Sequence, residues 1–236
     1  MFDLPDCETL LERFSGQFPS ESDLFGTDTE ICSWNRMAVH YAPFNHQPRP
    51  AKLILLGITP GKQQAEMAWR RATQAYKQGS SLDESIAFAK SKARFGGNMR
   101  PHLISMMNQI GIPEMMDIPN SSLIFDGDLE TVYSGSVVRF PALKNMGNYT
   151  GSSPKLRREP TLIKMFQEWT KSALLDMPKA LIVPMGIRVQ ELLLDEGFED
   201  RTLIGFPHPS GANASRKKVF QNNLESMREI VREWAD

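Results

Sequence analysis

Cysteine, histidine and long apolar runs are all scarce in this sequence. Its 236 residues include two cysteines, Cys7 and Cys32, and four histidines. Two thiols without a CxxC or HxxxH pair exclude a metal cluster held by four cysteines, and reduced thiols are typical of the cytoplasm. No leader pattern opens the sequence, and no apolar run approaches the ~20 residues of a membrane span. These absences favour a cytoplasmic protein that does not enter membranes.

A strong charge of either sign is also lacking. Lysine and arginine number 27 against 28 aspartates and glutamates, so the formal net charge is -1. The net charge therefore indicates neither a nucleic-acid partner nor an acidic one. Basic residues nevertheless gather in RREP (157–160) and ASRKK (214–218). A 41% hydrophobic fraction over this length is typical of one globular domain with its own core.

Short apolar runs alternate with amphipathic segments from residue 52 onward, whereas residues 1–50 mix helical signals with loops. The apolar runs predict strands within 53–56, 131–140, 179–186 and 202–211. The amphipathic periodicity predicts helices within 63–78, 81–93, 100–112, 160–175, 187–197 and 216–235. This alternation indicates an α/β fold, a three-layer α/β/α sandwich around a mostly parallel four-stranded sheet.

Unusual residues follow three of the four predicted strands. They are GITPGKQ (57–63), SGSVVRFP (134–141) and GFPHPSG (205–211). Because the carboxyl ends of parallel strands meet at one edge of a sheet, we expect these segments to form one ligand site. GITPGKQ does not match the phosphate-binding pattern GxxxxGK[ST], and an ordinary strand-to-helix turn is the alternative explanation for it.

His208 lies between Pro207 and Pro209, which restrict the backbone on both sides of it. A rigid imidazole suits the stabilisation of charge that develops on a bound group, and Ser210 with the following amides suits a phosphate. A structural histidine in a proline-rich turn is the alternative. No GxSxG motif is present, so a hydrolase triad is not indicated.

The GxxPG turn after the first core strand, paired with a late HPS turn, resembles the uracil-DNA glycosylase superfamily. LILLGITPG (53–61) is similar to its first motif and GFPHPSGANASR (205–216) to its second. The resemblance covers the chain from about Lys52 to its end, and either motif alone is weak. Relative to the family, the single domain over 1–236 carries an N-terminal extension over about 1–50 and a helical insertion over about 65–92.

The resemblance implies a monomeric enzyme that flips a nucleotide out of DNA and hydrolyses its N-glycosidic bond without a cofactor. His208 carries over as the residue that stabilises negative charge on the departing base, and Phe95 as the ring that stacks on it. Ser210 carries over as a contact to backbone phosphate. The remaining residues expected to contact substrate or DNA flank these motifs: Gly57, Ile58, Pro60, Gly61, Lys62, Gln63, Gly211, Asn213 and Arg216.

Two positions depart from the family pattern. Thr59 stands where the family has a residue that handles water, and threonine can hydrogen-bond a water but is no general base. Ser136 stands where an asparagine pairs with the uracil edge, and its short side chain leaves room for a larger base. We therefore expect a modified pyrimidine as the target, such as a hypermodified cytosine of phage DNA, in an anti-phage defence role.

Three alternatives stay open. Uracil or mismatch repair is the first, because the leaving-group motif at 206–211 matches the family. A catalytically inactive DNA-binding module is the second, because both Thr59 and Ser136 depart from the pattern. A scaffolding or inhibitor-type protein that uses the fold alone is the third.

Overall fold

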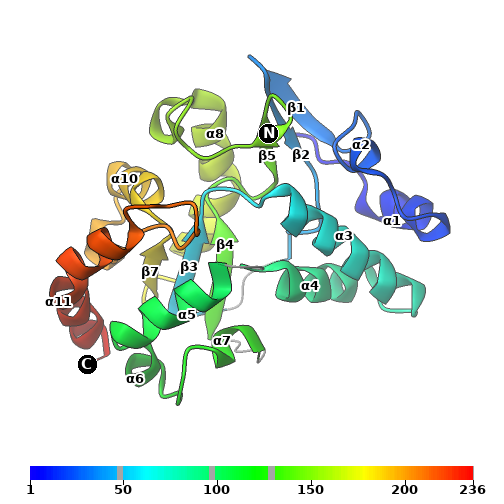
Figure 1. The fold of residues 1–236 in the computed structure, drawn as a ribbon. Helices are drawn as coiled ribbons and strands as arrows, with labels where there is room; N and C mark the ends of the chain where they lie inside the picture. Colours follow the sequence, from blue (N-terminus) through cyan, green and yellow to red (C-terminus); the bar gives the residue numbers. More distant parts are fainter. Residues whose placement is uncertain (47–49, 96–98, 127–130, 236) are drawn as a thin grey trace.

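The computed structural model describes residues 1–46, 50–95, 99–126 and 131–235 (Figure 1). The strands are β1 (Glu30–Trp34), β2 (Met37–His40), β3 (Leu53–Gly57), β4 (Val132–Ser136), β5 (Ala142–Lys144), β6 (Gly147–Asn148) and β7 (Leu181–Pro184). The helices of the first half are α1 (Cys7–Gly16), α2 (Glu21–Leu24), α3 (Lys62–Lys77), α4 (Leu82–Ala93), α5 (Met99–Gln109), α6 (Ile112–Met116) and α7 (Leu123–Asp126). Those of the second half are η1 (Leu156–Arg158), α8 (Pro160–Met165), η2 (Phe166–Lys171), α9 (Ser172–Leu175), α10 (Ile187–Asp195), η3 (Glu199–Arg201) and α11 (Arg216–Ala235).

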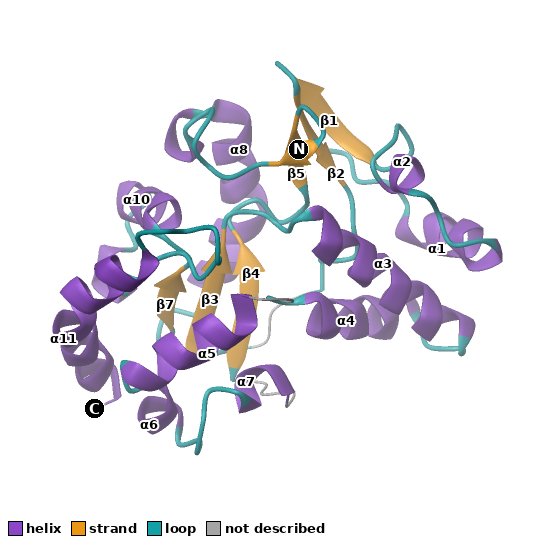
Figure 2. Cartoon of the chain, in the orientation of Figure 1, coloured by secondary structure: helices purple, strands orange, loops and turns teal. Residues whose placement is uncertain are grey.

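A parallel sheet of order β4-β3-β7 lies at the centre of the fold (Figure 2). All five residues of β3 are buried, as its unbroken apolar sequence predicts. Successive side chains of a strand point to opposite faces, so Ile54 and Leu56 join one hydrophobic cluster and Leu53 and Leu55 the other. The first cluster includes residues of α1, α3, α4 and α10, and the second includes residues of α5, α6 and α11.

The prediction of an α/β fold is confirmed, but the central parallel sheet has three strands where four were predicted. The segment expected to supply the fourth makes one parallel bridge, between Thr202 and Ile182, with Leu203 N donating to Ile182 O at 2.8 Å. Gly205 then takes a φ of +90°, and the proline-rich loop follows. Proline lacks the amide hydrogen that a strand ladder needs, so the pairing ends there.

A second sheet, antiparallel and of order β1-β2-β5-β6, was not predicted. Its strands have two to five residues, which is too short to show a clear alternation of polar and apolar side chains. Two of them lie in the N-terminal segment that the sequence analysis assigned to helical signals and loops. Val39 of β2 and Leu143 of β5 join the same cluster as Leu56, so residues 1–50 share a core with the parallel sheet.

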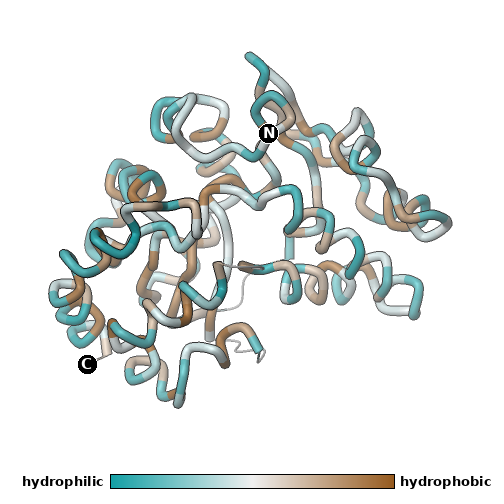
Figure 3. The backbone as a smooth tube through the Cα atoms, viewed as in Figure 1, coloured by the Kyte–Doolittle hydropathy of each residue, from teal (hydrophilic) through white to brown (hydrophobic). Residues whose placement is uncertain are grey.

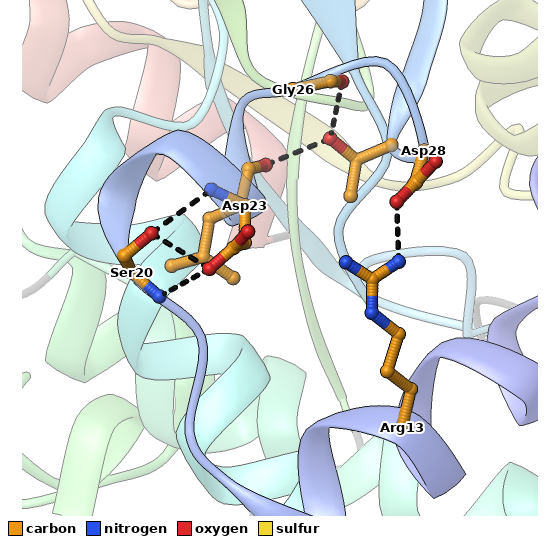
Figure 4. Close-up of polar contacts among 7 residues, drawn as sticks. Arg13, Ser20, Asp23, Gly26 and Asp28 are labelled. Carbon is orange, nitrogen blue, oxygen red and sulfur yellow. Dashed lines mark hydrogen bonds and ion pairs between the residues drawn. The ribbon is translucent and has the colours of Figure 1, made fainter.

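The N-terminal segment is held by short-range polar contacts (Figure 4). Ser20 and Asp23 cap α2 reciprocally, which satisfies amides that a helix start leaves without partners. Arg13 of α1 pairs with Asp28, and the hydroxyl of Thr29 donates to the carbonyls of Leu24 and Gly26 at 2.9 and 3.2 Å. α2 lies beside the start of α3, where Lys62 pairs with Glu21, and α1 packs along the later turns of α3, where Phe14 contacts Trp69.

The helices expected between residues 63 and 93 are present as α3 and α4, which pack against each other. The inward face of α3 carries Ala65, Ala68, Trp69 and Ala72, all nearly inaccessible. Ser81 with Glu84 forms the capping box that starts α4. Figure 3 shows the corresponding pattern: brown apolar segments concentrate in the central strands, and teal polar segments mark the outer turns of the helices.

Candidate functional site

A cavity of about 750 Å³ opens at the carboxyl ends of β3, β4 and β7. Its walls come from the segments after these strands and from the loop that leads into α11, which Figure 1 shows above the end of β3. Ligand sites of this fold class lie at this edge of the sheet. Of the residues predicted to form the site, the cavity brings together Gly57, Ile58, Thr59, Pro60, Gly61, Phe95, Ser136, His208, Ser210 and Asn213.

Four predicted site residues do not line this cavity, namely Lys62, Gln63, Gly211 and Arg216. Lys62 pairs with Glu21, with its ammonium 5.4 Å from the ring centroid of Phe25. Gln63 lines a separate hollow between α1 and α3, and Gly211 is exposed. Both Lys62 and Gln63 lie in the first turn of α3, where successive side chains point in different directions around the helix, so nearness in sequence to Gly61 did not place them in the cavity.

His208 is held in one tautomer. The backbone amide of Ser210 donates to its Nδ1 at 3.2 Å, and an amide can only donate, so the proton of the neutral ring is on Nε2. Burial lowers the pKa of His208 below its ordinary value. The cavity is therefore lined by a neutral imidazole with one N–H donor.

The loop around His208 is fixed through its carbonyl oxygens. Asn213 Nδ2 donates to His208 O at 3.2 Å, and His102 Nδ1 lies 3.1 Å from Pro209 O. Arg216 donates to Pro209 O at 3.2 Å and to Ser210 O at 2.6 Å. The guanidinium of Arg216, which was predicted to contact DNA, thus binds carbonyl oxygens of the loop and does not line the cavity. These bonds keep the histidine in place before any ligand arrives.

Phe95 and Ser136 meet beside Gly57. A Cβ built on Gly57 would lie 3.5 Å from Ser136 Oγ and 4.0 Å from Phe95 Cε1, so the absence of a side chain at this position keeps the space between them open. Phe95 has a φ of +45°, a left-handed conformation that is rare for a bulky residue. Strain of this kind concentrates at functional sites, which supports the prediction that the Phe95 ring contacts a ligand.

Thr59 lines the cavity, but its hydroxyl is engaged by the backbone. Oγ1 donates to Phe140 O at 2.8 Å and accepts from Ala142 N at 2.8 Å. The hydroxyl proton is therefore not available to orient a water molecule. The catalytic role expected for Thr59 is replaced by a structural one, because its side chain joins the end of β3 to the start of β5.

Replacing Thr59 by valine is expected to lower the free energy of unfolding by about 1–3 kcal/mol. Valine has the same shape but leaves Phe140 O and Ala142 N without these partners. Urea denaturation measures the change. Thr59→Ser is the control, since it retains the hydroxyl and should lose less than half as much. An equal loss in both variants would show that the methyl group matters as much as the two hydrogen bonds, and a loss in Thr59→Ser alone would assign the effect to the methyl group.

Sequence reasoning missed a group of polar residues in the cavity wall. Lys90, Arg94, Tyr133 and Arg139 all line it. Lys90 follows Ile86 by four residues and lies near Ala89 and Ala93, the buried face of α4, and a lysine at such a position was the available signal. Burial, with smaller contributions from the positive charges of Arg139 and Arg94, lowers the pKa of Lys90 to about 7.

The described part of the cavity wall contains cations but neither aspartate nor glutamate. Arg188, one of these cations, pairs with Glu191 at 3.2 Å. Burial lowers the pKa of Arg139 and raises that of Tyr133. Within the described ranges, no group of three or more histidine, cysteine, aspartate or glutamate side chains is arranged to hold a metal ion.

This chain is similar to a known protein along most of its length. The chain is 30% identical over 223 residues to the uncharacterized protein YoxB of Bacillus subtilis (strain 168), covering 92% of this chain and 87% of YoxB. No protein-family model matches the chain. No solved structure matches it either. In the portion of the chain that the structure describes, no helix is both long enough and apolar enough to cross a membrane.

Proposed function

This chain belongs to one family with YoxB of Bacillus subtilis, and we propose that it is a DNA glycosylase that releases a flipped pyrimidine base and leaves an abasic site. The observation that carries the proposal is His208: a neutral imidazole with its proton on Nε2, held rigidly at the edge of a cavity. A fixed donor of this kind suits a departing base on which negative charge develops. We propose that the finer architecture is that of the uracil-DNA glycosylases, with the Thr202 segment as the remnant of a fourth strand.

In the proposed reaction, bond breaking depends on stabilisation of the leaving group, which is the base. The bond between C1′ and the base nitrogen breaks, and its electron pair stays on the base, where the Nε2–H of His208 donates to a base oxygen. The sugar is left as a cation. Water adds its hydroxyl to C1′, and its proton passes to the base or to solvent. Because no carboxylate is among the described residues of the cavity wall, stabilisation of the base anion supplies the main acceleration.

DNA would approach at the mouth of the cavity. Ser210 and Ser215 line the cavity there, and Lys217 and Lys218 are exposed in the first turn of α11. Lysines beside a helix start attract backbone phosphates, and each phosphate they neutralise makes binding more dependent on salt. Entry of a base further requires the nucleotide to leave the stack.

The shape of the cavity favours a base larger than uracil. Its volume of about 750 Å³ lies within the roughly 300–1,000 Å³ typical of sites for drug-sized molecules, and a single pyrimidine ring fills only part of it. Ser136 and Gly57 leave space beside Phe95 at the position where the base would be read. We propose a modified pyrimidine as the target, which suits a role in defence against phages with modified DNA. An inactive DNA-binding module is the second candidate, favoured by the engagement of the Thr59 hydroxyl with the backbone.

Duplexes that each contain one altered base test the proposed function. The panel holds uracil, hypoxanthine, 5-hydroxymethylcytosine and its glucosylated form, and alkali cleaves any abasic site that results. We expect strand breaks with at least one modified pyrimidine and none with an unmodified duplex. Salt-dependent DNA binding without breaks on any substrate would support the inactive module instead. Breaks confined to uracil would retain the glycosylase and overturn the modified base.

A further inference from the structure

The peptide bond between Pro209 and Ser210 makes hydrogen bonds on both of its sides. Its amide, on Ser210, donates to His208 Nδ1 at 3.2 Å. Its carbonyl, on Pro209, lies 3.1 Å from Nδ1 of His102 and accepts from Arg216 at 3.2 Å. The bond is trans, and the N–H and C=O of a planar trans peptide point in opposite directions. The partners of the carbonyl therefore also fix the direction of the amide that binds His208.

His102 supplies its donor from a helix that the core holds in place. A carbonyl oxygen can only accept, so the proton of the His102 ring that faces Pro209 O is on Nδ1. The next residue, Leu103, is fully buried, and Met106, four residues after His102, is nearly so. The half-buried His102 thus lies at the edge of the face of α5 that packs into the core. A donor on such a helix has a defined position before any ligand binds.

A reversal of this peptide plane would exchange its two polar groups. The carbonyl of Pro209 would then face Nδ1 of His208, and a carbonyl beside a ring nitrogen requires a proton on that nitrogen. The neutral ring would carry its proton on Nδ1 and leave Nε2 bare, so the cavity would lose its donor. Reversal would also break the bonds that His102 and Arg216 make to Pro209 O. The two orientations of one peptide therefore correspond to the two tautomers of His208.

The two partners of the Pro209 carbonyl differ in how much of the loop they hold. Arg216 donates to Ser210 O at 2.6 Å as well as to Pro209 O, so it fixes two successive carbonyls. The His102 ring lies against the loop, with Cε1 4.0 Å from a Cβ built on Gly211, and its Nδ1 meets the Pro209 carbonyl. His102 is therefore the partner whose removal acts chiefly on the orientation of this one peptide.

Given the proposed glycosylase function, we infer that His102 is a positioning residue: it sets the tautomer of His208 by holding the carbonyl of the peptide whose amide binds the His208 ring. His102 does not line the cavity, so it acts through this peptide and not on the base. Donation to the carbonyl polarises the peptide and strengthens its N–H as a donor, so the two hydrogen bonds reinforce each other. The proton of His208 is thereby kept on Nε2, where the departing base needs it.

Nitrogen-15 NMR spectra of the free protein test this inference without requiring catalysis. The shifts of Nδ1 and Nε2 report which nitrogen carries the proton, and a His208→Ala spectrum identifies the His208 signals among those of four histidines. In His102→Ala we expect the Nδ1–H form of His208 to gain about 2- to 10-fold on the Nε2–H form, the range for the loss of one hydrogen bond. The pKa of His208 should also rise, because an amide that turns away from Nδ1 no longer opposes protonation there.

Two further variants separate the hydrogen bond from other effects. His102→Asn retains a donor, since Nδ2 of asparagine takes the place of Nδ1 of histidine, and it should restore the wild-type spectrum. Asn108→Ala is the matched control, because it removes another bond between an α5 side chain and the backbone, donated by Ser121 N at 2.9 Å, outside the cavity wall. It should leave the His208 signals unchanged. Equal changes in His102→Ala and His102→Asn would assign the effect to the lost ring or its charge and overturn the inference.

Single-turnover release on the best substrate of the duplex panel connects the tautomer to function, and melting temperatures establish that each variant folds. His102→Ala should be about 3- to 10-fold slower than wild type, because some rings lack the Nε2 donor and the others are held less rigidly. His102→Asn should be close to wild type. Slower release with an unchanged His208 spectrum would overturn the inference and retain the glycosylase. The expected spectra without release from any duplex by wild type would overturn the glycosylase and retain the role of His102.

Discussion

Replacement of His208 by alanine is expected to slow base release about 100- to 1,000-fold, because the cavity then lacks the fixed donor for the departing base. Burial keeps the pKa of His208 below its ordinary 6.5, so the ring is neutral from about pH 7 to 9 and the wild-type rate should not follow its titration there. Single-turnover kinetics on the best substrate of the duplex panel measure the rate, and fluorescence anisotropy measures DNA affinity.

Affinity separates a catalytic role of His208 from a structural one. The loop carbonyls are bound by Asn213 and Arg216, which the alanine variant retains, so the dissociation constant for DNA should change less than about threefold. His208→Gln supplies a neutral N–H donor on a more flexible side chain and should fall between wild type and alanine. A His208→Ala variant that releases base at the wild-type rate would remove the central observation behind the glycosylase proposal.

Alanine at Gly186 is expected to reduce base release about 100-fold, although residue 186 itself carries no reactive group. A Cβ there would lie 2.9 Å from His208 Cβ and 3.2 Å from His208 N, and backbone so close must move. A displacement of about 1 Å at a catalytic group can cost a factor of this size. The φ of +92° and ψ of 168° at Gly186 form a backbone conformation that is almost confined to glycine, and it adds about 1–3 kcal/mol of strain for any residue with a side chain.

Gly197→Ala is the matched control for this experiment. Gly197 has a φ of +83°, and a Cβ on it meets no atom within 4 Å, so the substitution introduces the backbone strain without the collision. Gly186→Ala should lose more stability in urea than Gly197→Ala because it adds the collision to the strain, and among variants that remain folded at the assay temperature only Gly186→Ala should lose activity while retaining DNA binding. If the two variants lose activity equally, general destabilisation explains the effect, and the position of His208 is not sensitive to Gly186.

The sequence alone determined the three parallel strands β3, β4 and β7, the long helices that follow them, and the edge of the sheet where the cavity lies. An apolar run such as Leu53–Leu56 is buried wherever it folds, and glycines and prolines after such runs end strands by their backbone geometry. Because parallel strands end at one edge, the segments 57–61 and 206–210 could be placed together without coordinates. The short strands β1, β2, β5 and β6 escaped prediction because each is too brief to carry a period.

Only the tertiary structure decided what individual polar side chains do. Three sets of contacts depend on how loops and helices pack. Thr59 binds Phe140, Arg216 binds the carbonyls of Pro209 and Ser210, and the ammonium of Lys90 lies over the ring of Tyr133. A motif gives a residue type and a position along the chain, but a hydroxyl or guanidinium binds whichever partner folding brings within about 3 Å. For this reason the location of the cavity followed from the sequence, whereas its charged inner wall required the fold.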